Sequence, residues 1–199
     1  MDTSTVITPP LIFIRHGETD WNAAGRLQGH IDIALNERGR AQARRNARAI
    51  LEKFPDVATY DFVASPLGRA RESMEIIRAT LGLDAKDFRF DDRLKEISHG
   101  DWEGSTGEEL QEKSPELVAQ RLASRWEFVP PNGESYRLLL ERLIPWLVTV
   151  DQPTVVVSHG GVGRVLRSHI LGVELFPSIT NIFSQDNAFH WRDGTETLI

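Results

Sequence analysis

Arginine, histidine and glutamate side chains in this sequence could together carry out phosphoryl chemistry. Arg15 and His16 are adjacent near the start of the chain, and Arg69, Glu96 and His159 follow far along it. Guanidinium groups stay charged and match the geometry of phosphate oxygens. A neutral imidazole can act as a nucleophile, and a carboxyl group can move protons. These residues predict a site for a phosphoryl group, provided that the fold brings them together.

Three short segments, all largely apolar, predict buried strands that would position most of these residues. They cover residues 11–14, 61–64 and 154–157. Arg15 follows the first, Ser65 and Arg69 follow the second, and His159 follows the third. In α/β sheets, ligands bind beyond the carboxyl ends of the strands. The three polar segments are therefore expected to meet at one edge of a sheet.

Helical periodicity predicts the elements between the strands. Helices are expected over residues 36–54, 68–81, 107–119, 134–148 and 162–170, and a short strand over 88–90. Pro145 should kink or end the fourth helix, and the stretch 180–199 should hold two strands around a turn at Asn187. Strands that alternate with helices indicate an α/β fold, a three-layer α/β/α sandwich around a mostly parallel central sheet.

The composition is that of one ordinary globular domain with an acidic charge. Of the 199 residues, 40% are hydrophobic and 26% charged, which predicts a single domain over 1–199 with a disordered lead-in over 1–10. The absence of cysteine excludes disulfides and thiolate metal sites, and the net charge of -6 argues against a nucleic-acid partner. No apolar run is long enough to cross a bilayer, and residues 1–10 lack signal-peptide features. No membrane partner and a cytoplasmic location are therefore expected.

The segment Arg-His-Gly-Glu-Thr at 15–19 resembles the signature of the histidine phosphatase superfamily, the family of cofactor-dependent phosphoglycerate mutases. Arg-His-Gly alone would be a weak signal, but further matching blocks cover most of the chain in the order that the family has. They lie at residues 21–22, 25–29, 35–39, 65–70, 94–96, 100–104, 131–135 and 158–161.

The resemblance implies a mechanism through a phosphohistidine. His16 would attack phosphorus as a neutral imidazole, with its other ring nitrogen donating to a backbone carbonyl. Glu96 would protonate the leaving oxygen and then activate water against the phosphohistidine, a role for which Asp101 and Glu103 compete. Four groups would hold the phosphoryl oxygens, namely Arg15, Asn22, Arg69 and His159. The scheme requires no cofactor and no metal, because these groups supply the charge stabilisation.

Several further residues are candidates for substrate contacts. Gln28, Gly29 and Gly160 belong to the loop and helix start that would face the substrate, although a turn residue and a loop amide would explain Asn22 and Gln28 about as well. His99 occupies the place where mutase relatives carry a substrate-contacting aromatic residue. It could line the pocket or only pack against Trp102.

The expected function is hydrolysis of a small phosphorylated metabolite, a phosphomonoester, through a phosphohistidine. The alternatives are phosphoryl transfer of the phosphoglycerate mutase type and a phosphate-binding protein without activity. Mutase relatives carry a longer insertion with basic residues for the substrate carboxylate, whereas the corresponding stretch here, 105–131, is short. It contains Lys113, Arg121 and Arg125, whose direction the sequence leaves open. Relatives are often dimers, so a homodimer is a further expectation.

Overall fold

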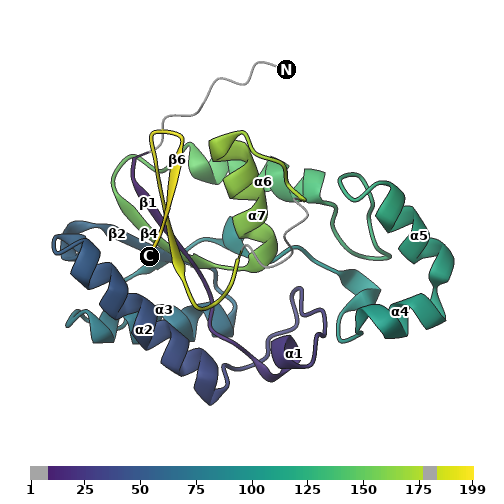
Figure 1. Cartoon of the computed structure of the whole chain (residues 1–199), viewed down its shortest axis with the longest axis horizontal. Coiled ribbons are helices and arrows are strands. Elements are labelled where there is room, and N and C mark those ends of the chain that lie inside the picture. Colours follow the sequence, from purple (N-terminus) through teal and green to yellow (C-terminus); the bar gives the residue numbers. More distant parts are fainter. Residues whose placement is uncertain (1–8, 177–182) are drawn as a thin grey trace.

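A six-stranded sheet forms the centre of the molecule in the computed structural model, which describes residues 9–176 and 183–199 (Figure 1). The strands are β1 (Leu11–Arg15), β2 (Asp61–Ala64), β3 (Arg89–Phe90), β4 (Thr154–Ser158), β5 (Ala188–Arg192) and β6 (Thr195–Leu198). Their order is β3-β2-β4-β1-β5-β6. The pairings of β1 with β4, β4 with β2 and β2 with β3 are parallel, and the β5–β6 hairpin adds an antiparallel edge. The predicted α/β class is confirmed, around a mixed sheet.

Helices cover both faces of the sheet, as the three-layer prediction requires. On one face lie α2 (Glu37–Lys53) and α3 (Gly68–Thr80), and on the other lie α6 (Tyr136–Leu147) and α7 (Gly160–Leu171). The remaining helices are α1 (Asp20–Ala23), α4 (Gly107–Lys113) and α5 (Pro115–Ala123). Successive side chains of a strand point to opposite faces. Ile12 and Ile14 of β1 accordingly pack in the core under α2 and α3, whereas Leu11 and Phe13 pack in the core under α6 and α7.

The loop after β1 runs very close to the start of α2. Asn36 caps this helix by accepting a hydrogen bond of 2.9 Å from the Gly39 amide. A Cβ atom added to Gly17 would lie 2.2 Å from the Gly39 carbonyl oxygen. Only glycine therefore allows the backbone that carries His16 to approach α2 so closely.

Two predicted helices differ from those in the structure. The helix expected over 107–119 is divided into α4 and α5, because Pro115 lacks an amide hydrogen and starts a new helix at its first position. The helix expected over 134–148 begins after Ser135, whose hydroxyl caps α6, and it contains Pro145 in its last turn without ending there.

The last hairpin turns later than the sequence suggested. Asn187 precedes β5, and the turn lies at Asp193-Gly194, where both residues have positive φ, of 51° and 69°. Two such residues in succession suit the tight turns that match strand twist. The first residues of the predicted stretch 180–199 and most of the expected lead-in over 1–10 lie outside the described residues.

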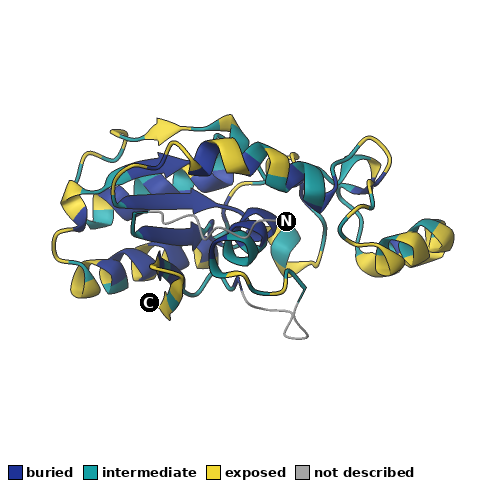
Figure 2. Cartoon of the chain, turned by 90° about the horizontal axis from the view of Figure 1, so that it is seen from above, coloured by how far each residue is buried: buried dark blue, intermediate teal, exposed yellow. Residues whose placement is uncertain are grey.

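Helices α4 and α5 form a projection beside the sheet (Figures 1 and 2). Most of their surface is exposed, and α5 has no fully buried residue. Among the helices of residues 9–176 and 183–199, none has the length and apolar character needed to cross a bilayer.

Candidate active site

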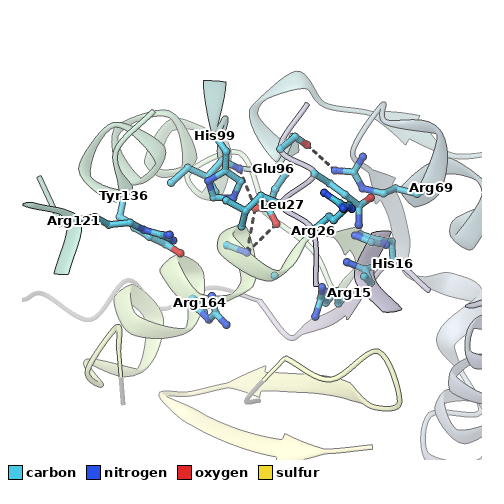
Figure 3. A pocket seen from close by; sticks show the side chains of 16 residues that line it. Arg15, His16, Arg26, Leu27, Arg69, Glu96, His99, Arg121, Tyr136 and Arg164 are labelled. Atoms are coloured by element: carbon cyan, nitrogen blue, oxygen red, sulfur yellow. Dashed lines mark hydrogen bonds between the residues drawn. The ribbon is translucent and has the colours of Figure 1, made fainter. Parts of the chain in front are cut away.

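A cavity of about 170 Å³ opens at the carboxyl ends of β1 and β4 (Figure 3). Most of the residues singled out from the sequence line it: Arg15, His16, Asn22, Gln28, Gly29, Arg69, Glu96, His99 and Gly160. The three polar segments thus meet at one edge of the sheet, as expected from the strand positions.

His16 is buried and held in one orientation at the inner end of the cavity. Its Nδ1 atom lies 2.7 Å from the carbonyl oxygen of Gly17, which can only accept. Nδ1 therefore carries the proton, and Nε2 keeps its lone pair. Burial, followed by the charges of Arg69 and Arg15, holds the pKa of His16 well below its ordinary value. The ring is thus uncharged, with one unprotonated nitrogen.

The His16 ring is expected to stay uncharged in the ligand-free protein when the pH falls through about 6.5, the ordinary imidazole pKa. Because His16 in the unfolded chain binds a proton below about pH 6.5 and the buried ring in the folded chain does not, the free energy of unfolding should fall as the pH falls through this value. Long-range proton–nitrogen NMR should show protonated Nδ1 and bare Nε2, with the urea-unfolded chain as the reference titration. Protonation of both nitrogens at the reference pKa would contradict the expectation.

Arg15 and Arg69 place two cations beside this histidine. Arg15 donates only one hydrogen bond within the described residues, from Nη1 to the carbonyl oxygen of Phe183 at 3.0 Å, and burial lowers its pKa to about 10. Arg69 is fully buried and donates to the carbonyl oxygens of Gly29 and Ile31 at 2.7 and 2.8 Å. Both groups stay charged at neutral pH. Arg69 also forms an ion pair of 3.5 Å with Asp32, and the Nε atoms of both arginines have no hydrogen-bond partner among the described residues.

His159 lies behind the surface of the cavity. It is fully buried, its Nε2 is 2.7 Å from the hydroxyl of Ser65, and its ring centroid is 5.1 Å from that of His16. Its Nδ1 has no hydrogen-bond partner among the described residues. Burial and the charge of Arg69 hold its pKa well below the ordinary value. The structure thus brings His159 next to His16 as a neutral ring.

Asn22 and Gln28 combine structural contacts with a place on the cavity wall. The side-chain oxygen of Asn22 accepts from the amide of Thr19 at 3.2 Å and from Gln185 at 2.9 Å, which leaves its amide nitrogen for a ligand. Gln28 donates to the hydroxyl of Thr19 at 2.8 Å. Of the two, Asn22 therefore has the freer donor.

Glu96 faces the start of α7 across the cavity. Both of its carboxylate oxygens lie 3.1 Å from the amide nitrogen of Gly161, and one accepts from the Ile97 amide at 2.9 Å. A Cβ atom on Gly161 would lie 2.5 Å from the carboxylate, so a larger residue there would displace the Glu96 side chain from this position. The competing carboxylates do not line the cavity. Asp101 accepts from Asn132, and Glu103 accepts from several backbone amides.

Arg142 of α6 holds the backbone of the segment that carries Glu96. Its guanidinium donates to the carbonyl oxygens of Arg93, Lys95 and Glu96, the last two at 2.8 and 3.0 Å, and it forms an ion pair of 2.8 Å with Glu134. One cation thus satisfies three carbonyl groups and a carboxylate.

Replacing Arg142 by methionine is expected to lower the free energy of unfolding by about 2 kcal/mol and Tm by about 4–8 °C, because the carbonyls and Glu134 lose their donor. Activity should fall as well, since the Glu96 backbone loses its support. Arg137→Met on the same helix is the matched control: Arg137 pairs only with the exposed Glu127 and Glu141 and should change Tm little. Equal shifts for the two variants in thermal melts would show that Arg142 is an ordinary surface arginine.

The cavity also contains residues that the sequence did not single out as site residues, or whose direction it left open. Arg26, Arg121, Tyr136 and Arg164 line it, and His99 lines it while also bordering the small hollow that contains Trp102. The direction of Arg121 depends on how α5 folds back, which no local pattern reports. Arg164 could have been suggested by its spacing, because it stands one helical turn after Gly160.

Among residues 9–176 and 183–199, no three histidine, aspartate or glutamate side chains cluster so that they could hold a metal ion.

Comparisons with known proteins agree with this geometry. The profile of the histidine phosphatase superfamily (branch 1) matches residues 11–188. Phosphoserine phosphatase 1 of Hydrogenobacter thermophilus is 35% identical over 83% of this chain and 77% of its own. The metal-independent phosphoserine phosphatase of Arabidopsis thaliana is 33% identical over 92% of this chain and 76% of its own. The solved mycobacterial glucosyl-3-phosphoglycerate phosphatase is similar with a TM-score of 0.69 and 32% identity, over 84% of each chain. The chain belongs to the histidine phosphatase superfamily, branch 1.

Proposed function

We propose that the protein hydrolyses a small phosphomonoester through a phosphohistidine at His16, without a metal. The observation that carries the proposal is the inner end of the cavity. There a neutral, oriented imidazole lies between the cations of Arg15 and Arg69, and Glu96 faces the same space. This arrangement suits an attack on phosphorus with stabilisation of the phosphoryl oxygens.

In the first step, Nε2 of His16 forms a bond to phosphorus while the ester P–O bond breaks. Glu96 gives its proton to the leaving oxygen, and the alcohol departs. In the second step, Glu96 takes a proton from water, the water oxygen bonds to phosphorus, and the N–P bond breaks. Arg15, Arg69 and the amide of Asn22 would hold the phosphoryl oxygens throughout. His159, which lies behind the cavity surface, would pack against His16 and help to hold the phosphoryl oxygens.

The small cavity favours a small substrate. Its volume of about 170 Å³ is below the roughly 300–1,000 Å³ of sites for drug-sized ligands. The relatives named above carry phosphatase names for phosphoserine and for a phosphoglycerate derivative. They support hydrolysis of a phosphorylated metabolite rather than transfer between two positions of one substrate.

The test is phosphate release from a panel of small phosphomonoesters in the presence of EDTA. Hydrolysis that persists in EDTA is the expected result. Absence of phosphate release from every compound at every pH would refute the proposal. Conversion of 3-phosphoglycerate to 2-phosphoglycerate with a bisphosphate primer, faster than phosphate release, would replace it by the mutase function.

A further inference from the structure

Nδ1 of His159 is a buried polar atom that has no hydrogen-bond partner in the described part of the chain. Its ring is fully buried, and the ring centroid lies 5.1 Å from that of His16 at the inner end of the cavity (Figure 3). The other ring nitrogen, Nε2, lies 2.7 Å from the hydroxyl oxygen of Ser65. Nδ1 is therefore the only nitrogen of this ring that remains for a ligand, and what it can do there depends on whether it carries a proton.

The sheet fixes the contact between Ser65 and His159. β2 and β4 pair in parallel, with Ala64 beside Val157, and the Ser65 amide extends the ladder by donating to the Val157 carbonyl oxygen at 3.0 Å. Ser65 and His159 thus follow the carboxyl ends of two neighbouring strands. Both side chains are fully buried, and close packing restricts them to few rotamers. Their hydrogen bond therefore belongs to the framework of the site and is present before a ligand binds.

The protons at this hydrogen bond distinguish the two neutral forms of His159. The Ser65 oxygen also accepts from the amide of Leu67, at 3.4 Å, and Ser65 has a single hydroxyl hydrogen. If that hydrogen is donated to Nε2, the neutral ring carries its proton on Nδ1, and only that N–H is left without a partner. If Nε2 donates instead, the Ser65 hydrogen finds no acceptor among the residues that the structure describes, and Nδ1 keeps an unpaired lone pair. Because each unsatisfied buried group costs free energy, the first form is favoured.

We propose that Ser65 is a positioning residue: its hydroxyl donates to Nε2 of His159 and keeps the proton on Nδ1, which donates to an oxygen of the phosphoryl group. The inference rests on the proposed function, which places that group beside His16. The two rings then have different tasks although both carry their proton on Nδ1. His16 donates that proton to the Gly17 carbonyl oxygen and presents a bare Nε2 to phosphorus, whereas His159 presents an N–H to the oxygens. A lone pair on Nδ1 of His159 would repel the same oxygens.

NMR of the ligand-free protein tests the tautomer without any reaction. Long-range proton–nitrogen spectra of the wild type should show His159 with a protonated Nδ1 and a bare Nε2, and His159→Ala identifies these signals by their loss. In Ser65→Ala, Nε2 has no donor, so a form with a protonated Nε2 is expected to appear. A wild-type His159 ring with a protonated Nε2 would overturn the proposal, and so would an unchanged tautomer in Ser65→Ala.

Two further variants separate the effect of the Ser65 hydroxyl from that of the packing around it. Ser158→Ala is the matched control, because Ser158 is equally buried and directly precedes His159, but its hydroxyl donates to the Leu94 carbonyl oxygen at 2.8 Å. It should lower Tm about as much as Ser65→Ala does and leave the His159 tautomer unchanged. Ser65→Thr keeps a hydroxyl and should restore the wild-type tautomer. The same tautomer change in Ser158→Ala as in Ser65→Ala would show a general packing effect and overturn the role of Ser65.

Phosphate affinity and turnover report what the tautomer does for the site. In Ser65→Ala, Kd for inorganic phosphate, measured by calorimetry, should rise severalfold. Its kcat for a small phosphomonoester should fall by about 10–100-fold, as when outer-shell partners of metal-bound histidines are removed. Ser158→Ala should keep the wild-type Kd for phosphate.

These measurements also separate the inference from the proposed function. Unchanged Kd and kcat in Ser65→Ala, despite a changed tautomer, would overturn the role of Nδ1 as a donor while leaving hydrolysis intact. A wild-type protein that shows the expected tautomer and loses phosphate affinity in Ser65→Ala, yet hydrolyses nothing, would support the positioning role of Ser65 and refute only the proposed function.

Discussion

His16→Ala is expected to lower kcat by about 10⁴–10⁶-fold, because the variant has no nucleophile to form the covalent intermediate. The Gly17 carbonyl orients the imidazole and burial keeps it neutral, so the ring already has the orientation and protonation state needed for attack in the ligand-free protein. Arg15 and Arg69 remain in the variant and should still bind inorganic phosphate. The loss should therefore appear in kcat and in covalent labelling rather than in phosphate affinity.

Trapping with labelled substrate checks the assignment directly. Brief exposure followed by denaturation should leave phosphate on the wild-type protein that is labile in acid and stable in base, and none on His16→Ala. His169→Ala is the control, because His169 is also a histidine of the described chain but does not line the cavity. Equal labelling of His16→Ala and wild type would refute the nucleophile, and loss of labelling in His169→Ala would point to a general folding effect.

Local patterns were sufficient to predict the parallel part of the sheet and the inner end of the site. Short, largely apolar segments predicted β1, β2 and β4, because strands covered on both faces are mostly apolar on both sides. Since parallel strands have their carboxyl ends at one edge, the residues that follow them had to meet there. Arg15, His16 and Arg69 were therefore predictable as a group, and the structure brings them to one cavity.

The outer end of the site could not be predicted in the same way. Arg121 reaches the cavity only because the chain breaks at Pro115 and α5 folds back, a tertiary arrangement without a local signal. Arg142 acts on backbone carbonyls of a segment that lies 46 to 49 residues earlier in the chain, so no spacing rule reveals it. The turn at Asp193-Gly194 was missed because Asn187 is an equally good turn residue when seen alone.

Glu96→Gln is expected to affect substrates according to their leaving groups. An alkyl alkoxide is a poor leaving group and needs a proton, so turnover of alkyl phosphates should fall by about 10²–10⁴-fold. Glutamine keeps a side-chain oxygen that can accept from the amides of Gly161 and Ile97, so the loop should stay in place. With p-nitrophenyl phosphate, whose leaving group needs little protonation, formation of the phosphohistidine should be much less affected.

The second step makes this variant diagnostic, because water attack also needs the Glu96 carboxylate. Glu96→Gln should therefore accumulate phosphohistidine from p-nitrophenyl phosphate and show a burst of one nitrophenol per site, followed by slow turnover. Asp101→Asn is the control: Asp101 competes for the role in sequence but accepts from Asn132 at the exposed surface. A burst in Asp101→Asn instead would show that Asp101, rather than Glu96, is the general acid and base. Equal losses for alkyl and aryl phosphates in Glu96→Gln, without a burst, would mean that Glu96 only supports the start of α7.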